Sequence, residues 1–331
     1  HIDREKYDIR TIGITKEGNW FLTDSPASDI SDGSWEQDEN NRRAFIVPDR
    51  GTGGIMAENA DGTFEVIRTD VVFPVLHGKN GEDGTMQGLL QLAGIPFIGS
   101  DTAASSASMD KAITKAMIEH RGYVDQARCY VVHQTAYDRD RNAQLEAVNS
   151  FFADTYPLFV KPANAGSSVG ISKVKRAEDL EKALDLAFAE DCKVLVEEAI
   201  TGREIEVAVL GNEEPQASCI GEIFAANEFY DYNAKYENSK SQTAIVRDLE
   251  PEKEQEIKDK AISVYETMGC SGMSRVDFFL EDGGRVVFNE INTLPGFTSI
   301  SMYPKLREAS GIPYDELIDR LIKLALDKYE R

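Results

Sequence analysis

The stretch VDFFLEDGGRVVFNEINTLPGFTS, residues 276–299, sets acids and an amide into sequence that otherwise predicts buried β-sheet. Apolar runs flank EDGG at 281–284, and such a short polar segment between two apolar runs predicts a β-hairpin. If those four residues form the loop, antiparallel pairing places Asp277 opposite Phe288. Because side chains alternate between the two faces of a strand, three oxygen-bearing side chains then share one face: Asp277, Glu290 and Asn292.

These three side chains are predicted to bind one or two divalent cations. Direct and diagonal neighbours on paired strands lie within about 8 Å of each other. Mg²⁺ prefers hard oxygen ligands, whereas a zinc site would use Cys or His, and no histidine lies near this hairpin in the sequence. Solvated acids on an edge strand remain the alternative. Arg275 and the Pro-Gly turn in TLPGFTS favour the metal site, because the turn's backbone amides could receive a developing oxyanion.

Composition limits the class of protein and of partner. The chain has 331 residues, 41% of them hydrophobic, which is enough for two or three packed domains. It has neither a stretch of about 20 apolar residues nor a secretory signal at its start, so we expect a cytoplasmic protein without a membrane partner. The four cysteines are widely spaced and predict neither a zinc site nor disulfides. A formal net charge of −22 disfavours nucleic acid, so small molecules are the expected partners.

The order of predicted elements indicates a strand-rich first part followed by mixed helices and strands. Residues 5–75 alternate short β-rich runs with turn residues, and 25–41 predict a surface loop. The runs 193–200 and 203–211 are expected to continue one sheet. Helices are predicted in a segment that ends at Gly94, in a segment with Asp110 as cap and Gly122 as stop, and over 177–191, 252–269 and 312–329.

A second candidate site is KPANAGSSVG, residues 161–170. Lys161 ends a predicted strand, and the Gly/Ser loop that follows has amides and hydroxyls that could surround phosphate oxygens. The order of residues is not that of a Walker loop, and GTGG at 51–54 lacks the strand and helix of a dinucleotide fingerprint. A Gly/Ser hairpin without a ligand remains the alternative, and Lys111 is either a phosphate contact or a solvated lysine on a helix.

Seven segments, in this order, resemble the D-alanine:D-alanine ligases of the ATP-grasp superfamily from about Tyr7 to the C-terminus. They are FPVLHGKNGEDGTMQG, SMDKAITK, FVKPANAGSSVGISKV, VEEAITGREIEVAVLGN, FYDYNAKY, CSGMSRVDFFL and NEINTLPGFTS. The resemblance implies an α/β (α+β) ATP-grasp fold in which two sheet-containing domains hold the nucleotide. It divides the chain into three domains: an N-terminal substrate domain (1–102), a central domain with the Gly/Ser loop (103–197) and a C-terminal domain with the lid loop and metal hairpin (198–331).

The same resemblance implies the ATP and metal contacts. The residues expected to contact ATP are Lys111, Lys161, Ser168, Glu197, Glu198, Ala199, Ile200, Glu204, Phe229, Lys235, Phe288 and Asn289. Asp277, Glu290 and Asn292 would hold two Mg²⁺ ions, for which Mn²⁺ could substitute. Such ions neutralise charge on a transferring phosphoryl group and align it with the attacking carboxylate.

The implied reaction forms D-alanyl-D-alanine for peptidoglycan, with ADP and phosphate as by-products. The carboxylate of one D-alanine takes the γ-phosphoryl group of ATP, and the amine of a second amino acid attacks the acyl phosphate. Arg275 and the Gly296 amide would stabilise the tetrahedral intermediate, and Tyr236 of the lid would bond to Ser167 to exclude water. Substrate contacts are expected from His77, Glu82, Ser301 and Met302, although a lone histidine after a strand is often structural.

Two alternatives to a D-alanine:D-alanine ligase stay open at this point. The family usually opens with a strand, a Gly-Gly turn and a helix whose glutamate anchors the first D-alanine, and this opening would precede His1. Either the numbering omits it or the molecule lacks it. If the molecule lacks it, the alternative is a non-catalytic nucleotide-binding relative. In the family that the chain resembles, D-lactate-using members tend to carry His in place of the lid tyrosine, so Tyr236 argues against D-lactate as acceptor. Members that favour D-serine or D-lactate often have Arg at the position of Met302, so this apolar residue favours D-alanine. A D-alanine:D-serine ligase of the vancomycin-resistance type is the alternative product class. The resemblance also implies a homodimer.

Overall fold

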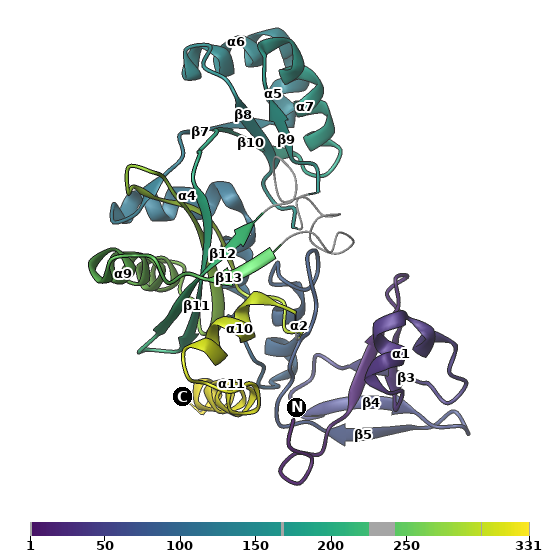
Figure 1. The fold of residues 1–331 in the computed structure, drawn as a ribbon. Helices are drawn as coiled ribbons and strands as arrows, with labels where there is room; N and C mark the ends of the chain where they lie inside the picture. Colours follow the sequence, from purple (N-terminus) through teal and green to yellow (C-terminus); the bar gives the residue numbers. More distant parts are fainter. Residues whose placement is uncertain (1, 167–168, 225–241, 299, 331) are drawn as a thin grey trace. The chain divides into compact units, whose positions relative to one another are not determined.

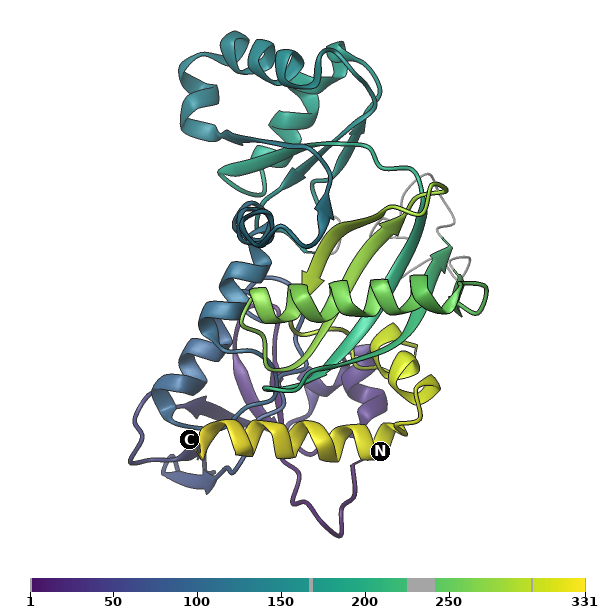
Figure 2. The same cartoon turned by 90° about the vertical axis from the view of Figure 1, so that its left-hand side faces the viewer.

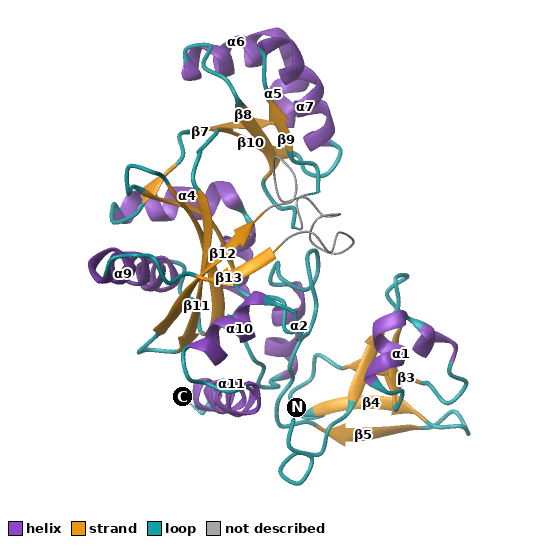
Figure 3. Ribbon diagram, in the orientation of Figure 1, coloured by secondary structure: helices purple, strands orange, loops and turns teal. Residues whose placement is uncertain are grey.

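The computed structural model describes residues 2–166, 169–224, 242–298 and 300–330 (Figure 1). Runs of strands and runs of helices follow one another along the chain, and Figure 3 distinguishes the two by colour. The residues form two compact units: unit 1 consists of His1–Phe73, Gln87–Ile98 and Asp315–Arg331, and unit 2 of Pro74–Met86 and Gly99–Tyr314. The predicted division into three domains remains a prediction.

Unit 1 contains an antiparallel sheet whose strands follow chain order. They are β1 (Thr11–Ile14), β2 (Trp20–Thr23), β3 (Arg42–Ile46), β4 (Gly54–Glu58) and β5 (Phe64–Arg68). The sheet's core includes Leu22, Ala44 and Ile55. Most of α2 (Thr85–Ala93) and of α11 (Tyr314–Tyr329) also belongs to unit 1.

The segment 25–41 lies largely at the surface, as predicted, but the prediction that it is a loop is wrong. This segment contains α1 (Ala27–Asp32) and a 3₁₀ helix, η1 (Ser34–Gln37). Trp35 of η1 is buried, and a Cβ at Gly13 would lie 2.3 Å from its ring, so the indole packs directly on the β1 backbone. The polar composition of the segment conceals this single apolar anchor, because both helices are too short to show an apolar period.

Unit 2 contains a four-stranded antiparallel sheet in the order β7-β10-β8-β9. Its strands are β7 (Cys129–His133), β8 (Leu158–Pro162), β9 (Ser172–Val174) and β10 (Lys193–Glu198). Near this sheet lie α5 (Gln134–Arg139), α6 (Arg141–Phe152) and α7 (Leu180–Phe188) (Figure 1), and η2 (Ala177–Asp179) directly precedes α7. The hydrophobic cluster between helices and sheet includes Val132, Val160, Leu184 and Val194. The opposite side of β8 and β10 is therefore available for polar side chains such as Lys161 and Glu197.

The second sheet of unit 2 has six strands in the order β13-β12-β11-β14-β15-β6. They are β6 (Asp125–Gln126), β11 (Arg203–Gly211), β12 (Gln216–Phe224), β13 (Gln242–Ile245), β14 (Gly272–Leu280) and β15 (Val286–Asn292). Helix α9 (Pro251–Thr267) lies across one face of this sheet (Figure 2) and packs on β11, β12, β14 and β15. Helix α10 (Met302–Ala309) packs on β11, β12 and β13.

One prediction about the sheets is wrong, because 193–200 and 203–211 do not continue a single sheet. The first forms β10 in the four-stranded sheet, and the second forms β11 in the six-stranded sheet. The chain leaves one sheet for the other at Gly202, where a Cβ would lie 2.5 Å from the Leu280 carbonyl oxygen. Only glycine permits this close approach of two backbones.

The predicted boundaries of α4 (Lys111–Arg121) are confirmed. The Asp110 carboxylate accepts hydrogen bonds from the backbone amides of Ala112, at 3.0 Å, and Ile113, at 3.1 Å. The helix ends at Gly122, whose φ of +73° is the left-handed conformation that glycine adopts readily. This cap fixes Lys111 as the first helical residue, beside the end of β8. Helix α3 (Thr102–Met109), directly before it, was not predicted from the sequence.

The pairing register of the β14–β15 hairpin differs from the prediction. Asp277 pairs with Glu290 instead of Phe288, and Phe288 pairs with Phe278. Asn289 is therefore an extra residue, a β-bulge, on β15. Without it, Glu290 would point to the core side of the sheet, where Val276 lies. The predicted common face for Asp277, Glu290 and Asn292 is thus confirmed, although the bulge and not the loop length produces it.

Candidate active site

Three carboxylates lie in one row across the six-stranded sheet. The row contains Gly221 of β12, Glu206 of β11, Asp277 of β14 and Glu290 of β15. Residues directly opposite each other on paired strands point to the same face. Glu206 and Asp277 are buried, with 4% and 7% of their surface exposed. Such a row is stable only if cations compensate the carboxylates.

Arg275 supplies one of these cations. It lies two residues before Asp277 on β14, opposite Asn292, and is buried. Its Nε and Nη2 donate to the two Asp277 carboxylate oxygens at 2.8 and 2.7 Å, and Nε lies 3.1 Å from Glu206 Oε1. Burial disfavours the charged guanidinium, but Asp277 and Glu206 outweigh it and hold the pKa of Arg275 well above its usual range. The group is a fixed positive charge at every pH at which the protein folds.

A largely buried ion triad joins the four-stranded sheet, which contributes Lys161 and Glu197, to helix α4, which contributes Lys115. Glu197 Oε2 lies 2.7 Å from Lys161 Nζ, and Glu197 Oε1 lies 2.8 Å from Lys115 Nζ. Burial alone would raise the pKa of Glu197, but Lys161 and Lys115 lower it to about 2. Lys161 also lies 3.3 Å from Asn289 Oδ1 of the bulge, so the triad connects the two sheets.

Replacing Glu197 with glutamine is expected to destabilise the protein by about 3 kcal/mol near pH 7, because two buried lysines would lose their counter-ion. The pKa of Glu197 is depressed in the folded state, so its contribution is complete above its ordinary pKa of 4.5 and disappears as the pH falls towards 2. The difference in unfolding midpoint between wild type and E197Q should therefore shrink below about pH 5. Its neighbour Glu198, which accepts from the Arg128 amide, gives a matched control in E198Q. A constant difference across this range would contradict the assignment.

Two cavities lie side by side between these elements of unit 2. The larger has a volume of about 350 Å³ and the smaller about 180 Å³. Six residues line both: Lys111, Ala165, Glu206, Ile223, Arg275 and Glu290. At this shared wall, Lys111 Nζ lies 3.8 Å from Glu290 Oε2 and donates to the Ala165 carbonyl oxygen at 2.8 Å. A group that enters from one cavity can therefore meet a group from the other beside a lysine, an arginine and a carboxylate.

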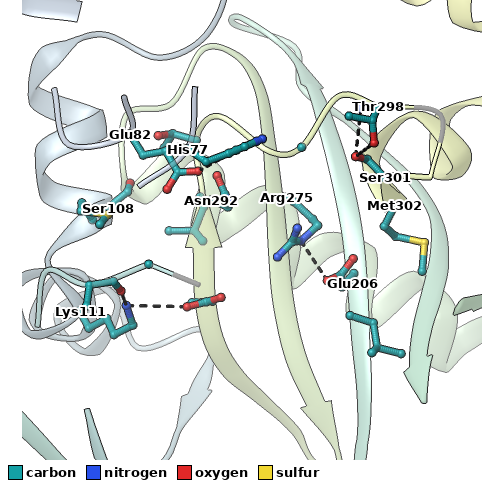
Figure 4. A pocket seen from close by; sticks show the side chains of 18 of the residues that line it. His77, Glu82, Ser108, Lys111, Glu206, Arg275, Asn292, Thr298, Ser301 and Met302 are labelled. Atoms are coloured by element: carbon teal, nitrogen blue, oxygen red, sulfur yellow. Dashed lines mark hydrogen bonds and ion pairs between the residues drawn. The ribbon is translucent and has the colours of Figure 1, made fainter. Parts of the chain in front are cut away.

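The smaller cavity has distinct polar groups at its two sides (Figure 4). On one side His77 Nδ1 lies 3.6 Å from Glu82 Oε1. On the other, Ser301 is the cap of α10, and its Oγ accepts from the Thr298 amide at 3.0 Å. Arg275 and Glu206 lie between these two sides (Figure 4). This arrangement is suited to two small polar molecules placed on either side of a fixed cation.

The family model described as D-ala D-ala ligase C-terminus matches residues 120–323, and the one described as D-ala D-ala ligase N-terminus matches residues 1–100. The chain belongs to the D-alanine–D-alanine ligase family. A D-alanine–D-alanine ligase from Caldicellulosiruptor bescii is 49% identical over 99% of this chain and 88% of that protein. The D-alanine–D-alanine ligase B of Clostridium tetani is 47% identical, over 99% of this chain and 87% of that protein.

Solved structures of the family agree with the fold. The VanG D-Ala:D-Ser ligase from Enterococcus faecalis matches with a TM-score of 0.85 and 37% identity, over 98% of this chain and 91% of that one. The D-alanine–D-alanine ligase from Coxiella burnetii matches with a TM-score of 0.84 and 35% identity, over 99% and 87%. The predicted α/β ATP-grasp fold is confirmed, and the protein is an ATP-dependent ligase that acts on small molecules. Among the described helices, none is both long and apolar enough to cross a membrane.

The D-alanine–D-alanine ligase residues named from the sequence gather around the two cavities. The larger cavity is lined by Lys111, Lys161, Glu197, Glu198, Ala199, Ile200, Glu204, Asp277, Phe288, Asn289 and Glu290, together with Arg275. The smaller is lined by His77, Glu82, Asn292, Gly296, Ser301 and Met302. The predicted roles of Ser167, Ser168, Phe229, Lys235 and Tyr236 concern positions outside the described residues. Which ligand atom each residue contacts stays a prediction.

Two buried charged residues of this ligase site were not predicted from the sequence. Glu206 has the same spacing from Glu204 as Asp277 has from Arg275, and Lys115 lies one helical turn after Lys111. These spacings place each pair on one face, which is a usable signal. It was missed because charged side chains on a helix or an alternating strand are usually solvated.

Family membership implies use of ATP and a divalent metal, and the donor atoms at the hairpin fit a hard cation. Two carboxylates and an amide oxygen share one face, and the field there is negative: burial raises the pKa of Glu204, and Asp277 raises it further. No three Asp, Glu, His or Cys side chains within the described ranges form a preformed cage. Asp277 is engaged by Arg275 instead, so cation binding requires this carboxylate to share or leave the guanidinium.

Proposed function

We propose that the protein joins two D-alanine molecules into D-alanyl-D-alanine and converts ATP to ADP and phosphate. The observation that carries this proposal is the shared wall of the two cavities, where Lys111, Arg275 and Glu290 face both. ATP occupies the larger cavity, and its γ-phosphoryl group reaches this wall. The two D-alanines occupy the smaller cavity, one on the side of His77 and the other on the side of Ser301.

In the first step, a carboxylate oxygen of the first D-alanine bonds to the γ-phosphorus as the bond to the β–γ bridging oxygen breaks, which gives D-alanyl phosphate and ADP. Lys111 and Lys161 bind the phosphates, and Glu197 keeps Lys161 charged and oriented. Two Mg²⁺ or Mn²⁺ ions held by Asp277, Glu290 and Asn292 would neutralise charge on the phosphoryl group. The residues of this chain thus contribute positioning and charge.

In the second step, the amine of the second D-alanine attacks the acyl carbon, phosphate leaves with the electron pair of its bond to that carbon, and the proton lost by the amine nitrogen passes to the departing phosphate. Arg275 and the Gly296 amide stabilise the negative oxygen of the tetrahedral intermediate. The hydroxyl of Ser301, the residue at the N-cap position of α10, binds the carboxylate of the acceptor, and Met302 contacts its methyl group. The product, D-alanyl-D-alanine, is a precursor of peptidoglycan. We also propose that the enzyme is a homodimer in the cytoplasm.

Met302 sets the expected acceptor preference. An apolar contact favours the methyl group of D-alanine, but a hydrophobic pocket rejects an added hydroxyl only weakly. We expect kcat/KM for D-alanine to exceed that for D-serine by about 10- to 100-fold. Chromatography of the products formed from ATP with D-alanine, D-serine and D-lactate tests this directly. Release of phosphate without dependence on D-alanine would refute the proposed function.

A D-alanine:D-serine ligase is the second candidate, since the VanG D-Ala:D-Ser ligase from Enterococcus faecalis resembles this chain with a TM-score of 0.85. The same product analysis separates the two. A preference for D-serine as acceptor would support the second candidate while retaining the ATP-dependent chemistry.

A further inference from the structure

We infer that Glu206 is a positioning residue that shares Arg275 with Asp277 and thereby leaves the Asp277 carboxylate available to a divalent cation. The inference rests on the proposed function, because it concerns the metal-binding side chains of that site. It adds a residue from β11, outside the hairpin that contains the metal-binding side chains.

The pairing registers bring the three groups together. Glu206 lies directly opposite Asp277 on paired strands, and strands in a sheet are about 4.8 Å apart. Both carboxylates are buried, so without a cation they would repel each other strongly. Arg275 contacts both: its Nε lies 3.1 Å from Glu206 Oε1 and 2.8 Å from Asp277 Oδ1 (Figure 4 shows the contact with Glu206).

Arg275 and a metal ion compete for the same atoms. The guanidinium binds Asp277 in bidentate fashion through both carboxylate oxygens, which are the atoms that would coordinate a cation. A bound cation and the guanidinium also repel each other. Arg275 can release Asp277 only if another buried carboxylate compensates the charge of its guanidinium. Glu206, which contacts the same guanidinium, supplies that carboxylate.

The two strand neighbours of Glu206 differ in chemistry: Asp277 lies opposite it on β14, and Gly221 lies opposite it on β12. On its other side the paired residue is Gly221 of β12, where a Cβ would lie 2.9 Å from Met302 Cε and 3.0 Å from Leu306 Cδ2. Apolar side chains of α10 therefore cover the sheet at Gly221. The Oε1 atom of Glu206 contacts Arg275 on the β14 side.

The test is a double-mutant cycle on Mn²⁺ affinity, measured in the presence of ADP by electron paramagnetic resonance of free Mn²⁺. E206Q is expected to weaken Mn²⁺ binding about tenfold in the otherwise wild-type protein, because Arg275 then retains Asp277. In the background of R275M, the same E206Q change should weaken binding no more than about threefold. The direct effect of the lost Glu206 charge is present in both backgrounds, so the difference isolates the action through Arg275.

Glu222 gives the matched control. It is a buried carboxylate on β12 of the same sheet, it is paired with Arg203, and it lines neither cavity. E222Q should leave Mn²⁺ affinity within about twofold, and E206D, which keeps the carboxylate, should restore part of the loss. If R275M does not fold, R275K serves as the second background, because a single ammonium group lacks the fork geometry that bridges both carboxylates.

The outcomes are separable. Equal weakening by E206Q in both backgrounds, or no weakening in the first, overturns the inference while D-alanine-dependent ligation remains intact. Failure of the wild-type protein to bind Mn²⁺ with ADP overturns the proposed metal site and the inference with it. If E206Q weakens Mn²⁺ binding about tenfold in the otherwise wild-type protein and no more than about threefold in the R275M background, both the metal site and the role of Glu206 are supported.

Discussion

Replacement of Arg275 with methionine is expected to lower kcat about a thousandfold, with a much smaller change in KM for ATP. Removal of a single hydrogen-bond donor that stabilises an oxyanion costs about 10²- to 10³-fold, and Arg275 contributes a full charge in a buried site. The loss falls on the step in which the tetrahedral intermediate forms, so ATP binding is affected less. Steady-state phosphate release with saturating D-alanine measures both parameters.

This substitution also affects stability, because Asp277 and Glu206 would lose a buried counter-ion. We expect destabilisation by about 3 kcal/mol, which urea unfolding can measure separately from activity. Arg203 provides the matched control: it bridges Glu222 and Asp248 on the same sheet but lines neither cavity. R203M should keep kcat within about twofold. A folded R275M enzyme with kcat within tenfold of wild type would remove Arg275 from the proposed mechanism.

Asp277→Ala is expected to abolish most turnover, by about a thousandfold or more at ordinary Mg²⁺ concentrations. The carboxylate is one of two acidic ligands proposed for the divalent cations, and such ions supply several kcal/mol of charge stabilisation in phosphoryl transfer. Stability should fall less than in R275M, because Glu206 still compensates the Arg275 guanidinium. Rates measured over a range of Mg²⁺ and Mn²⁺ concentrations should show a raised metal requirement.

Asp282, an exposed acid in the loop of the same hairpin, provides the control for this variant. D282A also removes one negative charge, but at the tip of the hairpin, away from the proposed metal-binding side chains. It should therefore keep the wild-type dependence on Mg²⁺. Normal turnover of D277A at ordinary Mg²⁺ would count against the metal site. A loss of turnover equal in D282A would instead indicate a general electrostatic effect.

Local sequence signals predicted much of the fold that positions the site. The cap at Asp110 and the stop at Gly122 define α4, because both act within one turn of the backbone. The hairpin at 276–292 was predicted from its apolar runs and turn. The collinear motifs then placed the expected ligand-contacting residues, and within the described part of the chain these residues line the two cavities.

Features that depend on contacts between distant segments could not be predicted in the same way. The bulge at Asn289 and the transfer of the chain between sheets at Gly202 follow from tertiary packing. The pairing of Arg275 with Glu206 joins residues 69 positions apart in the sequence (275 − 206). The short helix at Trp35 depends on a single buried ring beneath polar residues, and composition alone does not reveal such an anchor.

The bulge on β15 determines which face of the sheet Glu290 and Asn292 point to. The extra residue at position 289 reverses the face of the sheet to which each later side chain of the strand points. Chain length between the hairpin tip and Glu290 is therefore under tighter constraint than side-chain identity at the bulge itself. A hairpin with one residue fewer before Glu290 would keep the same side chains in its sequence but would direct Glu290 and Asn292 into the hydrophobic interior, while Asp277 on β14 would keep its face.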